Sequence, residues 1–464
     1  MKRWIGSWIK YFVDRWLASG ESCEDLLKKH FGSLSLTSIV TTVRVFPSTA
    51  RVDLQQALDT IFKEQYPLQK FVGVHERYSH DTTSFSSLLS SGGSEATVGP
   101  LQYDDVEVGN DLPARCLKNA LWMAHSGELP FVVLTSPAMN YGRVSGVHVE
   151  VAVPPGEAGL EFSRSFLSQL EKQVNAAGSY RGKILSLEIA DNYSGKVSGV
   201  KVHRLRSVTR DQVILPEKTL QLLERNISDF IQYREELKAL QMPIKKGLLF
   251  YGPPGTGKTH TIHYLASQMP DHTTFLINAE QVALMDHYIQ LARFLQPAAI
   301  VIEDADLIAR SRTSMNSPCE ESLLNKLLNE MDGLREDAQL LFILTTNRPE
   351  QLEPALAARP GRIDQAIEFP LPDDEGRRKL VKLYAGGLTI SAELVEVLVR
   401  KTRKASAAFI KELMRRSAQY TLQAKNGNML LPEQVEQALD EMLFSGGSLN
   451  RKLLGAGDDS DSPS

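Results

Sequence analysis

One stretch of the chain fits the pattern G-x-x-x-x-G-K-[ST], directly after the apolar run 247–251 and before a segment with helical spacing. The stretch and the residue after it are Gly252, Pro253, Pro254, Gly255, Thr256, Gly257, Lys258, Thr259 and His260. Backbone N–H groups of such a loop can surround nucleotide phosphates, and the helix that begins near Gly257 turns its positive dipole end toward them. Lys258 reaches the terminal phosphates, and Thr259 offers a hydroxyl to Mg²⁺. The stretch therefore predicts a site for ATP and Mg²⁺.

Two acids, Glu303 and Asp304, follow another apolar run at 298–302. Nucleotide hydrolysis needs a carboxylate that holds the metal ion and a group that orients the attacking water. We assign Glu303, together with Thr259, to the metal ion and expect Asp304 to polarise the water. Asn347 ends the apolar run 340–346 and can hold that water or sense the γ-phosphate. Solvated acids at a strand end and a structural Asn in a turn are the alternative interpretations.

Arg359 and Arg362 lie on either side of a Pro-Gly pair. A guanidinium is rigid and permanently charged, so it suits the charge that develops on a transferred phosphoryl group. Taken alone, two arginines near such a turn are more often surface charges. The sequence thus gives six candidate catalytic residues, which are Lys258, Glu303, Asp304, Asn347, Arg359 and Arg362.

The elements that must position these residues are strands first and helices later. Near-continuous apolar runs separated by helical patterns indicate parallel strands of a sheet that is covered on both faces. The runs are 247–251, 275–278, 298–302 and 340–347. From about Asp373 only helical spacing is found, at 375–384, 392–401, 407–424 and 432–443. We predict an α/β module of the P-loop NTPase type, followed by an α-helical subdomain.

The first half of the chain mixes strand and helix patterns. Alternating apolar residues at 38–45 and 144–153 predict strands, and helical spacing is found at 53–62 and 162–177. The Ser- and Gly-rich stretch 82–100 predicts a loop with no packing of its own. We expect an α+β domain that recruits a partner or substrate, and the sequence does not identify which.

These patterns divide the chain into an N-terminal α+β domain at 1–206, an α/β subdomain at 207–372, a helical subdomain at 373–445 and a tail at 446–464. The tail is rich in Gly and Ser and then in Asp, a composition that favours disorder.

Residues 1–20 contain three of the four tryptophans, Trp4, Trp8 and Trp16. On a helical wheel they share one side with further apolar residues, and lysine and arginine lie on the other side. Such a helix can make peripheral contact with a membrane or dock on a partner. The alternative, which we favour, is a helix packed on its own domain.

Composition argues against several classes of protein. The formal net charge of −4 and the lack of a basic stripe argue against nucleic-acid binding. The cysteines Cys23, Cys116 and Cys319 lack the spacing of a zinc site or a disulfide framework, which indicates a reducing compartment. No apolar run reaches the roughly 18–20 residues of a membrane-spanning helix, and no signal-peptide pattern is found. We expect an intracellular, cytoplasmic protein.

These motifs, in this order, resemble the classical clade of AAA (AAA+) ATPases. The resemblance rests on 252–259, Glu303-Asp304-Ala305-Asp306, 325–334, 345–349 and 359–362. The region 329–362 resembles the second region of homology, which separates this clade from other AAA+ proteins. The resemblance covers roughly 207–444 and does not extend to residues 1–200.

The resemblance implies a large α/β subdomain, a helical lid and usually a hexameric ring of identical subunits with ATP between neighbours. It implies that Lys258 and Thr259 contact phosphate and Mg²⁺ and that Asn347 is sensor 1. Arg359 and Arg362 would then be arginine fingers that act on the ATP of the next subunit. The lid segment 405–409 has small residues where other AAA+ proteins have a sensor-2 arginine.

Two features depart from the family pattern. The usual Walker B order is Asp then Glu, whereas this chain has Glu303 then Asp304, as in the mitochondrial AAA protein that translocates the folded Rieske protein. The aromatic-hydrophobic-Gly signature of pore loops is also missing between 278 and 300. Tyr288 could serve as a grip there, although we favour a tyrosine on a helix surface. No H-E-x-x-H motif follows the lid, which excludes a fused protease.

The leading hypothesis is an ATP-hydrolysing ring motor or chaperone that remodels protein clients or complexes. The second is a nucleotide-gated scaffold with slow hydrolysis, which the order of Glu303 and Asp304 favours. The third is a remodeller of nucleic-acid complexes, which no basic patch supports.

Overall fold

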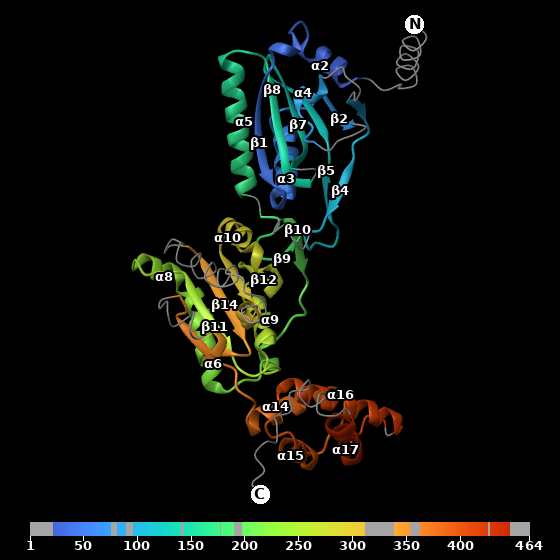
Figure 1. The fold of residues 1–464 in the computed structure, drawn as a ribbon, viewed down its shortest axis with the longest axis vertical. Coiled ribbons are helices and arrows are strands. Elements are labelled where there is room, and N and C mark those ends of the chain that lie inside the picture. The colour runs from blue at the N-terminus through green and yellow to red at the C-terminus, as the bar shows by residue number, and fades with distance from the viewer. Residues whose placement is uncertain are drawn as a thin grey trace. The chain divides into compact units, whose positions relative to one another are not determined.

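The computed structural model describes residues 22–75, 81–89, 96–140, 143–176, 178–189, 197–310, 338–352, 362–425 and 427–445 (Figure 1). The chain forms two compact units. The first comprises Met1–Tyr180 and Leu187–Val202, and the second comprises Arg181–Ser186 and His203–Ser464. Four sequence predictions lie outside the described residues: the helix at 1–20, the motif at 325–334, the position of Arg359 and the disorder of the tail at 446–464.

A six-stranded antiparallel sheet with the order β1-β8-β7-β6-β2-β3 is central to the first unit. Its strands are β1 (Val40–Pro47), β2 (Lys70–His75), β3 (Thr97–Gly99), β6 (Ala120–Ser126), β7 (Leu129–Asn140) and β8 (Arg143–Val153). Strands β4 (Tyr103–Val106) and β5 (Ala114–Leu117) pair separately. The strands predicted at 38–45 and 144–153 are β1 and β8, and they pair with each other.

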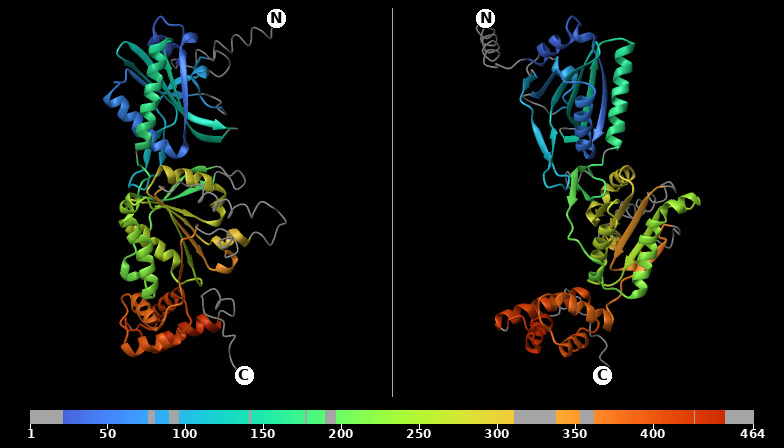
Figure 2. Two further views of the ribbon diagram at one scale, coloured as in Figure 1. Left: turned by 90° about the vertical axis from the view of Figure 1, so that its left-hand side faces the viewer. Right: turned by 180° about the vertical axis from the view of Figure 1, so that it is seen from behind.

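Helices cover both faces of this sheet (Figure 2). One face packs on α3 (Arg51–Glu64) and α5 (Glu157–Ala176), around Trp122 and Phe131. The other face packs on α2 (Cys23–Phe31) and α4 (Phe85–Leu88), around Leu121 and Met123. Successive side chains of a strand point to opposite faces, which is why Trp122 and its two neighbours belong to different cores.

The prediction of a loop without packing at 82–100 is wrong for the described part of that stretch. It contains α4 and β3, and Phe85 and Leu88 are each only 3% exposed. Ser84 caps α4 by accepting a hydrogen bond from the Ser87 N–H. A serine that suggested a loop therefore begins a short helix. Apolar residues three positions apart share one side of that helix and reach the core.

A second sheet has seven strands in the order β10-β9-β12-β13-β14-β11-β15, of which β11 to β15 lie wholly in the second unit. Its strands are β9 (Ile184–Ile189), β10 (Val197–His203), β11 (Lys246–Tyr251), β12 (Thr273–Ile277), β13 (Ala298–Ile302), β14 (Leu340–Thr346) and β15 (Gln365–Glu368). The four predicted strands are β11 to β14, and they pair in parallel. The chain passes between the units within β9 and again at the end of β10.

Helices lie against both faces of β11 to β14. Residues of α6 (Glu217–Leu223), the π-helix η4 (Glu224–Asp229) and α9 (Lys258–Gln268) join one core with Phe250 and Ile343. Short helices α7 (Phe230–Gln232) and α8 (Arg234–Ala239) follow η4. Helices α10 (Met285–Phe294) and α11 (Ala305–Arg310) follow β12 and β13.

Tyr288 lies on α10 and is fully buried. Its ring meets the Phe275 ring edge to face, with 6.0 Å between centroids. Both interpretations of this residue, a surface tyrosine and a grip for substrate, are therefore wrong. The helix turns this side toward β12, because an amphipathic helix buries its apolar side against the sheet.

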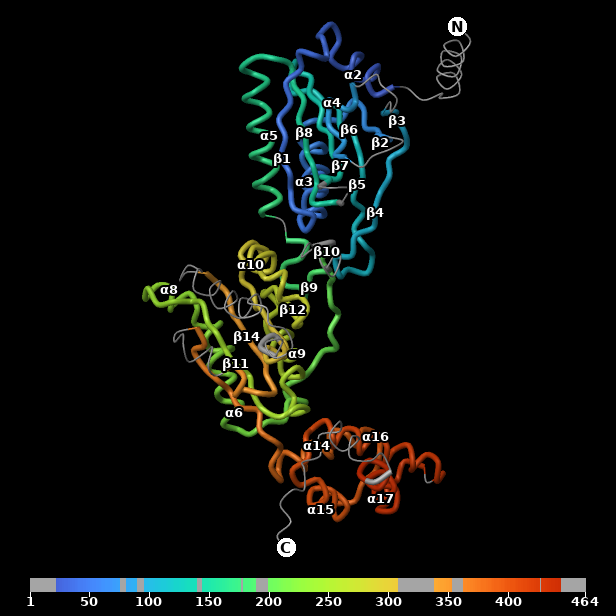
Figure 3. Tube along the Cα trace, viewed as in Figure 1, coloured from blue at the N-terminus to red at the C-terminus, as the bar shows by residue number. Residues whose placement is uncertain are grey.

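Four predicted helices follow β15, and Figure 3 traces them in the C-terminal part of the chain. They are α14 (Asp374–Ala385), α15 (Ala392–Lys401), α16 (Ala407–Gln423) and α17 (Pro432–Asp440), with a short π-helix η7 (Glu441–Ser445) after them. They enclose a core of their own around Leu398, Phe409 and Leu413. We refer to residues 374–445 as the lid. None of the helices in the described ranges is long and apolar enough to cross a membrane.

Candidate nucleotide-binding and active site

The glycine-rich stretch connects β11 to α9, and its glycines are required by the backbone. Gly252 and Gly257 have φ angles of 146° and 100°, which side chains disfavour. A Cβ on Gly252 would lie 2.2 Å from the Phe369 carbonyl oxygen, so the loop must pass close to the strand end there. At Gly257 nothing lies within 4 Å of the Cβ position. The start of α9 therefore leaves open space for a ligand.

Lys258 is 7% exposed and points into the loop. Its Nζ donates to the carbonyl oxygens of Gly252 at 2.8 Å and Pro253 at 3.0 Å, and to Asn347 Oδ1 at 2.8 Å. Burial lowers the pKa of Lys258 to about 8, and the carboxylates of Asp304 and Asp306 offset part of this shift. These three hydrogen-bond partners are neutral, so the cation is suited to an anionic ligand.

Thr259 and Glu303 come from different elements and meet at the same place. The Thr259 hydroxyl donates to Glu303 Oε1 at 2.7 Å. Glu303 directly follows β13, and its N–H is held by the Ile277 carbonyl at 2.9 Å. Hydroxyl and carboxylate oxygens are ligands that Mg²⁺ prefers. The pair therefore fits a magnesium ion beside bound phosphates.

Asp304 and Asn347 follow the ends of β13 and β14 and are linked to Lys258 by hydrogen bonds of the Asn347 amide. Asn347 Nδ2 donates to Asp304 Oδ1 at 3.0 Å, while its Oδ1 accepts from Lys258. Asp304 has a positive φ of 49°, and its N–H donates to Thr345 Oγ1 at 3.0 Å. The amide of Asn347 thus joins a cation and a carboxylate that are far apart in the sequence.

Asp306 holds the backbone beside Asn347 in place, a role that was not predicted from the sequence. It is 3% exposed and accepts hydrogen bonds from Thr346 Oγ1 at 2.8 Å and from the Asn347 N–H at 3.3 Å. These contacts hold the end of β14 where the Asn347 side chain reaches Lys258. The available signal was an acid between two apolar residues, because such an acid needs partners when the segment is buried.

A cavity of about 380 Å³ lies over these residues, within the size range of small-molecule sites. The phosphate loop, Asp304 and Asn347 form one side of it. Residues 212–215, which precede α6, form another side, and His260 Nε2 lies 3.2 Å from the Gln212 carbonyl oxygen. No sequence pattern predicts residues 212–215 as part of a site.

The lid supplies the third side of the cavity through Leu380, Tyr384, Ala407, Ala408 and Lys411. The Ala408 N–H donates to the Gly255 carbonyl oxygen at 3.0 Å, so the start of α16 touches the phosphate loop. A side chain at position 255 would not fit there, because a Cβ on Gly255 would lie 2.8 Å from the Ala408 Cβ and 2.9 Å from Ser406 Oγ. The glycine at position 255 therefore permits this close contact with the lid.

The structure brings together Lys258, Thr259, Glu303, Asp304 and Asn347. Arg362 does not line the cavity of its own chain and is half-buried elsewhere. Arg359 lies outside the described residues.

Comparison with known proteins identifies the module. Residues 248–371 match the family described as "ATPase family associated with various cellular activities (AAA)". The chain is 28% identical over 260 residues to the proteasome-activating nucleotidase of Methanothermobacter thermautotrophicus, covering 53% of this chain and 63% of that protein. It is 27% identical over 363 residues to the 26S proteasome regulatory subunit 8 homolog of Encephalitozoon cuniculi, covering 67% of this chain and 90% of that protein.

A third relative is the ATP-dependent zinc metalloprotease FtsH of Mycobacterium bovis, 31% identical over 230 residues, or 47% of this chain and 30% of that protein. The chain spans less than two thirds of the nucleotidases from Methanothermobacter, at 63%, and from Pyrococcus abyssi, at 66%. The parallel sheet, the phosphate loop at its edge, the helical lid and these matches agree with one another. Residues 248–371 therefore form a module of the AAA ATPase family, which uses ATP with Mg²⁺.

Proposed function

We propose that this protein hydrolyses ATP as a hexameric ring of identical subunits in the cytoplasm and uses the reaction to remodel protein clients or complexes. The observation that supports hydrolysis most directly is the contact of Asn347 with both Lys258 and Asp304, beside the pair of Thr259 and Glu303. Lys258, Thr259, Asp304 and Asn347 line one cavity, and Glu303 is bonded to Thr259 there, which supports roles in binding phosphate, metal and water.

Each residue then has a distinct task. Lys258 binds the terminal phosphates, and its pKa of about 8 keeps it charged at pH 7. Thr259 and Glu303 would hold a magnesium ion, and the charge that such an ion supplies would offset that of the phosphates. Asp304 accepts a hydrogen bond from the attacking water and withdraws its proton. Asn347 holds that water against Asp304.

Arg362, with Arg359, acts on the ATP of the neighbouring subunit. Its place outside the cavity of its own chain supports this assignment. Hydrolysis then depends on assembly, because each site is completed by residues of two subunits.

The names of the relatives support a protein client, since two of them are a proteasome-activating nucleotidase and a metalloprotease. The buried position of Tyr288 and the missing pore-loop signature favour folded or assembled clients over threading of an extended chain. The first unit recruits the client.

The experiment is the ATPase rate per subunit as a function of protein concentration, with mass measured in parallel. We expect the rate to rise with concentration. Arg362→Ala should still assemble and bind ATP, and its turnover should fall by about 10³-fold or more. Arg293→Ala, which removes an exposed arginine of α10, is the matched control and should behave as wild type. A rate that does not depend on concentration would contradict the proposal.

The nucleotide-gated scaffold is the second candidate, and the order of Glu303 and Asp304 favours it. Asp304 is one methylene shorter than a glutamate at the same place, so its carboxylate reaches less far from the backbone. The double variant Glu303→Asp with Asp304→Glu restores the usual order. A large gain in turnover would support the scaffold, whereas an unchanged or lower rate would support the motor.

A further inference from the structure

The segment that follows Arg362 is fastened to the strand that leads into the phosphate loop. Asp364 Oδ2 accepts a hydrogen bond from the Gly247 N–H at 2.8 Å. The Asp364 N–H donates to the Gly247 carbonyl oxygen, also at 2.8 Å. Gly247 lies in β11, which is buried on both faces of the sheet. One residue is thus tied to a rigid strand through both its side chain and its backbone.

Two further features lie next to Asp364, the pairing of β15 with β11 and the ammonium of Lys246. From Gln365 to Glu368 the chain becomes β15 and pairs in parallel with Leu248–Tyr251. The ammonium of Lys246 lies 4.6 Å from the centroid of the Phe230 ring. Burial lowers the pKa of Lys246, and the charge of the Asp364 carboxylate offsets part of this shift. The carboxylate therefore meets both the Gly247 N–H and the field of a partly buried cation.

Arg362 lies only two residues before this anchor. A span of two residues reaches about 7 Å at most, so the position of Asp364 restricts where the Arg362 backbone can lie. The side chain of Arg362 is half-buried, which restricts it further. An arginine stabilises a developing charge best when its guanidinium is already in position, because moving it into place during the reaction would raise the activation free energy.

We propose that Asp364 is the positioning residue that directs Arg362 toward the ATP of the neighbouring subunit. This inference rests on the proposed function, in which Arg362 acts between subunits. The competing explanation is that Asp364 only steadies β11 and so the phosphate loop of its own chain, which begins five residues after Gly247. In a ring of mixed subunits the two explanations predict opposite results.

The experiment mixes two variants that are each expected to be inactive, Asp364→Ala and Lys258→Ala. In a mixed ring, the intact phosphate loop of an Asp364→Ala subunit can meet the intact arginines of a Lys258→Ala subunit. We expect an equal mixture to recover about a quarter of the wild-type rate, since random assembly makes about one interface in four complete. Asp364→Ala alone should bind ATP with an affinity within about twofold of wild type, because its own loop is unchanged.

The reference mixture is Arg362→Ala with Lys258→Ala. If the reference recovers activity and the Asp364→Ala mixture does not, Asp364 acts on its own loop and the inference is overturned, while the shared site stands. If neither mixture recovers, the shared site fails and the inference fails with it. Glu368→Ala, an exposed acid on β15, is the matched control and should keep the wild-type rate without mixing.

Two further variants keep the test decisive should Asp364→Ala bind ATP poorly. Asp364→Asn retains an oxygen that can accept from the Gly247 N–H, so it should keep at least about half of the activity if the hydrogen bond does the positioning. Asp364→Glu retains the charge but displaces the anchor by one methylene. It should lose turnover alone and recover it in the mixture with Lys258→Ala, and failure to recover would overturn the inference.

Discussion

Asn347 accepts a hydrogen bond from Lys258 Nζ at 2.8 Å, which links the end of β14 to the phosphate loop. The same amide donates to Asp304 at 3.0 Å, and Asp306 holds its backbone N–H. A movement of the Lys258 ammonium therefore changes the position of Asn347 and, through it, that of the Asp304 carboxylate, which we assign to the attacking water.

Replacing Asn347 by alanine should lower kcat by about 10²-fold, or about 3 kcal/mol, because Asp304 and the water lose the group that orients them. ATP affinity should change by less than about threefold, because Lys258 keeps its hydrogen bonds to the carbonyl oxygens of Gly252 and Pro253. Steady-state kinetics and calorimetric titration separate the two quantities. Asn428→Ala, which removes an exposed lid amide bonded to the Gly387 carbonyl, is the control. Equal losses of kcat and affinity would argue that Asn347 only supports the loop.

ATP affinity should weaken with rising pH through Lys258. Burial lowers the pKa of this ammonium to about 8 in the free protein, and only its charged form attracts phosphate. Binding is therefore strongest below pH 8, and we expect about a tenfold loss of affinity between pH 7 and pH 9. Lys258→Arg keeps its charge throughout this range, so whatever affinity it has should stay level. The same loss in both proteins would assign the pH dependence to another group.

The stability of the second unit should fall in mild acid because of His272. This side chain is 6% exposed, and burial, with a smaller contribution from Arg234, lowers its pKa to about 4. Between pH 6.5 and pH 4, His272 is therefore protonated in the unfolded chain but stays neutral in the folded chain. The free energy of unfolding should drop by about 2 kcal/mol from pH 7 to pH 5 through this group. Urea denaturation at both pH values should give a smaller drop for His272→Gln, and an equal drop would count against this account.

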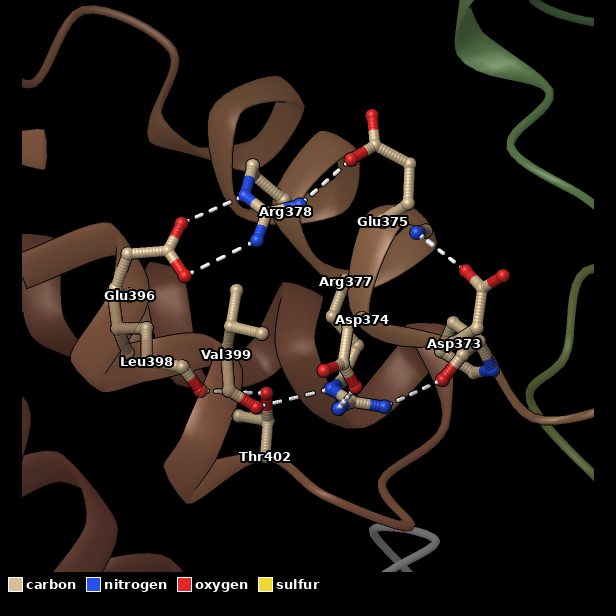
Figure 4. Close-up of polar contacts among 11 residues, drawn as sticks. Asp373, Asp374, Glu375, Arg377, Arg378, Glu396, Leu398, Val399 and Thr402 are labelled. Carbon is tan, nitrogen blue, oxygen red and sulfur yellow. Dashed lines mark hydrogen bonds and ion pairs between the residues drawn. The ribbon is translucent and has the colours of Figure 1, made fainter.

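Arg377 and Arg378 are neighbours on α14 whose loss should have very different effects (Figure 4). Arg377 is 6% exposed and donates to the carbonyl oxygens of Val399 at 3.0 Å and Pro372 at 2.7 Å, besides pairing with Asp374. Arg378 is more exposed and pairs with Glu396 and Glu375. Arg377→Ala should destabilise the lid by about 2–4 kcal/mol, because buried carbonyls lose their donors and the packed stem is removed.

Arg378→Ala should have a much smaller effect, because solvent screens exposed ion pairs. Urea denaturation of the two variants, with hydrogen exchange to follow α14 and α15, makes the comparison. Similar losses for both would show that the charge of these residues matters more than the buried hydrogen bonds.

Much of the second unit could be predicted from its sequence because its signals are local. A buried parallel strand needs a short apolar run, so β11 to β14 were found, and the lid helices were found from their spacing. The glycines, Lys258 and Thr259 form one continuous stretch whose backbone makes the loop. The acids and Asn347 follow strand ends, and parallel strands bring their carboxyl ends to one edge of the sheet.

Other parts depended on contacts that no local pattern encodes. The strand β15 has four residues and is defined by pairing with β11. Tyr288 has the sequence surroundings of a surface residue and is buried only because α10 turns that side toward Phe275. Serines at 84 and 87 cap a helix whose apolar residues complete the core of a distant sheet.

The sequence by itself thus determined the family, the phosphate loop and the candidate residues for phosphate, metal and water, because each is specified by residue type at a fixed spacing. Only the tertiary structure decided that Asn347 joins Lys258 to Asp304, that Asp306 holds Asn347, that the lid closes one side of the cavity and that Asp364 is tied to Gly247. These relationships join residues from 41 to more than 100 positions apart. They exist because packing the strands side by side brings those residues within hydrogen-bond distance.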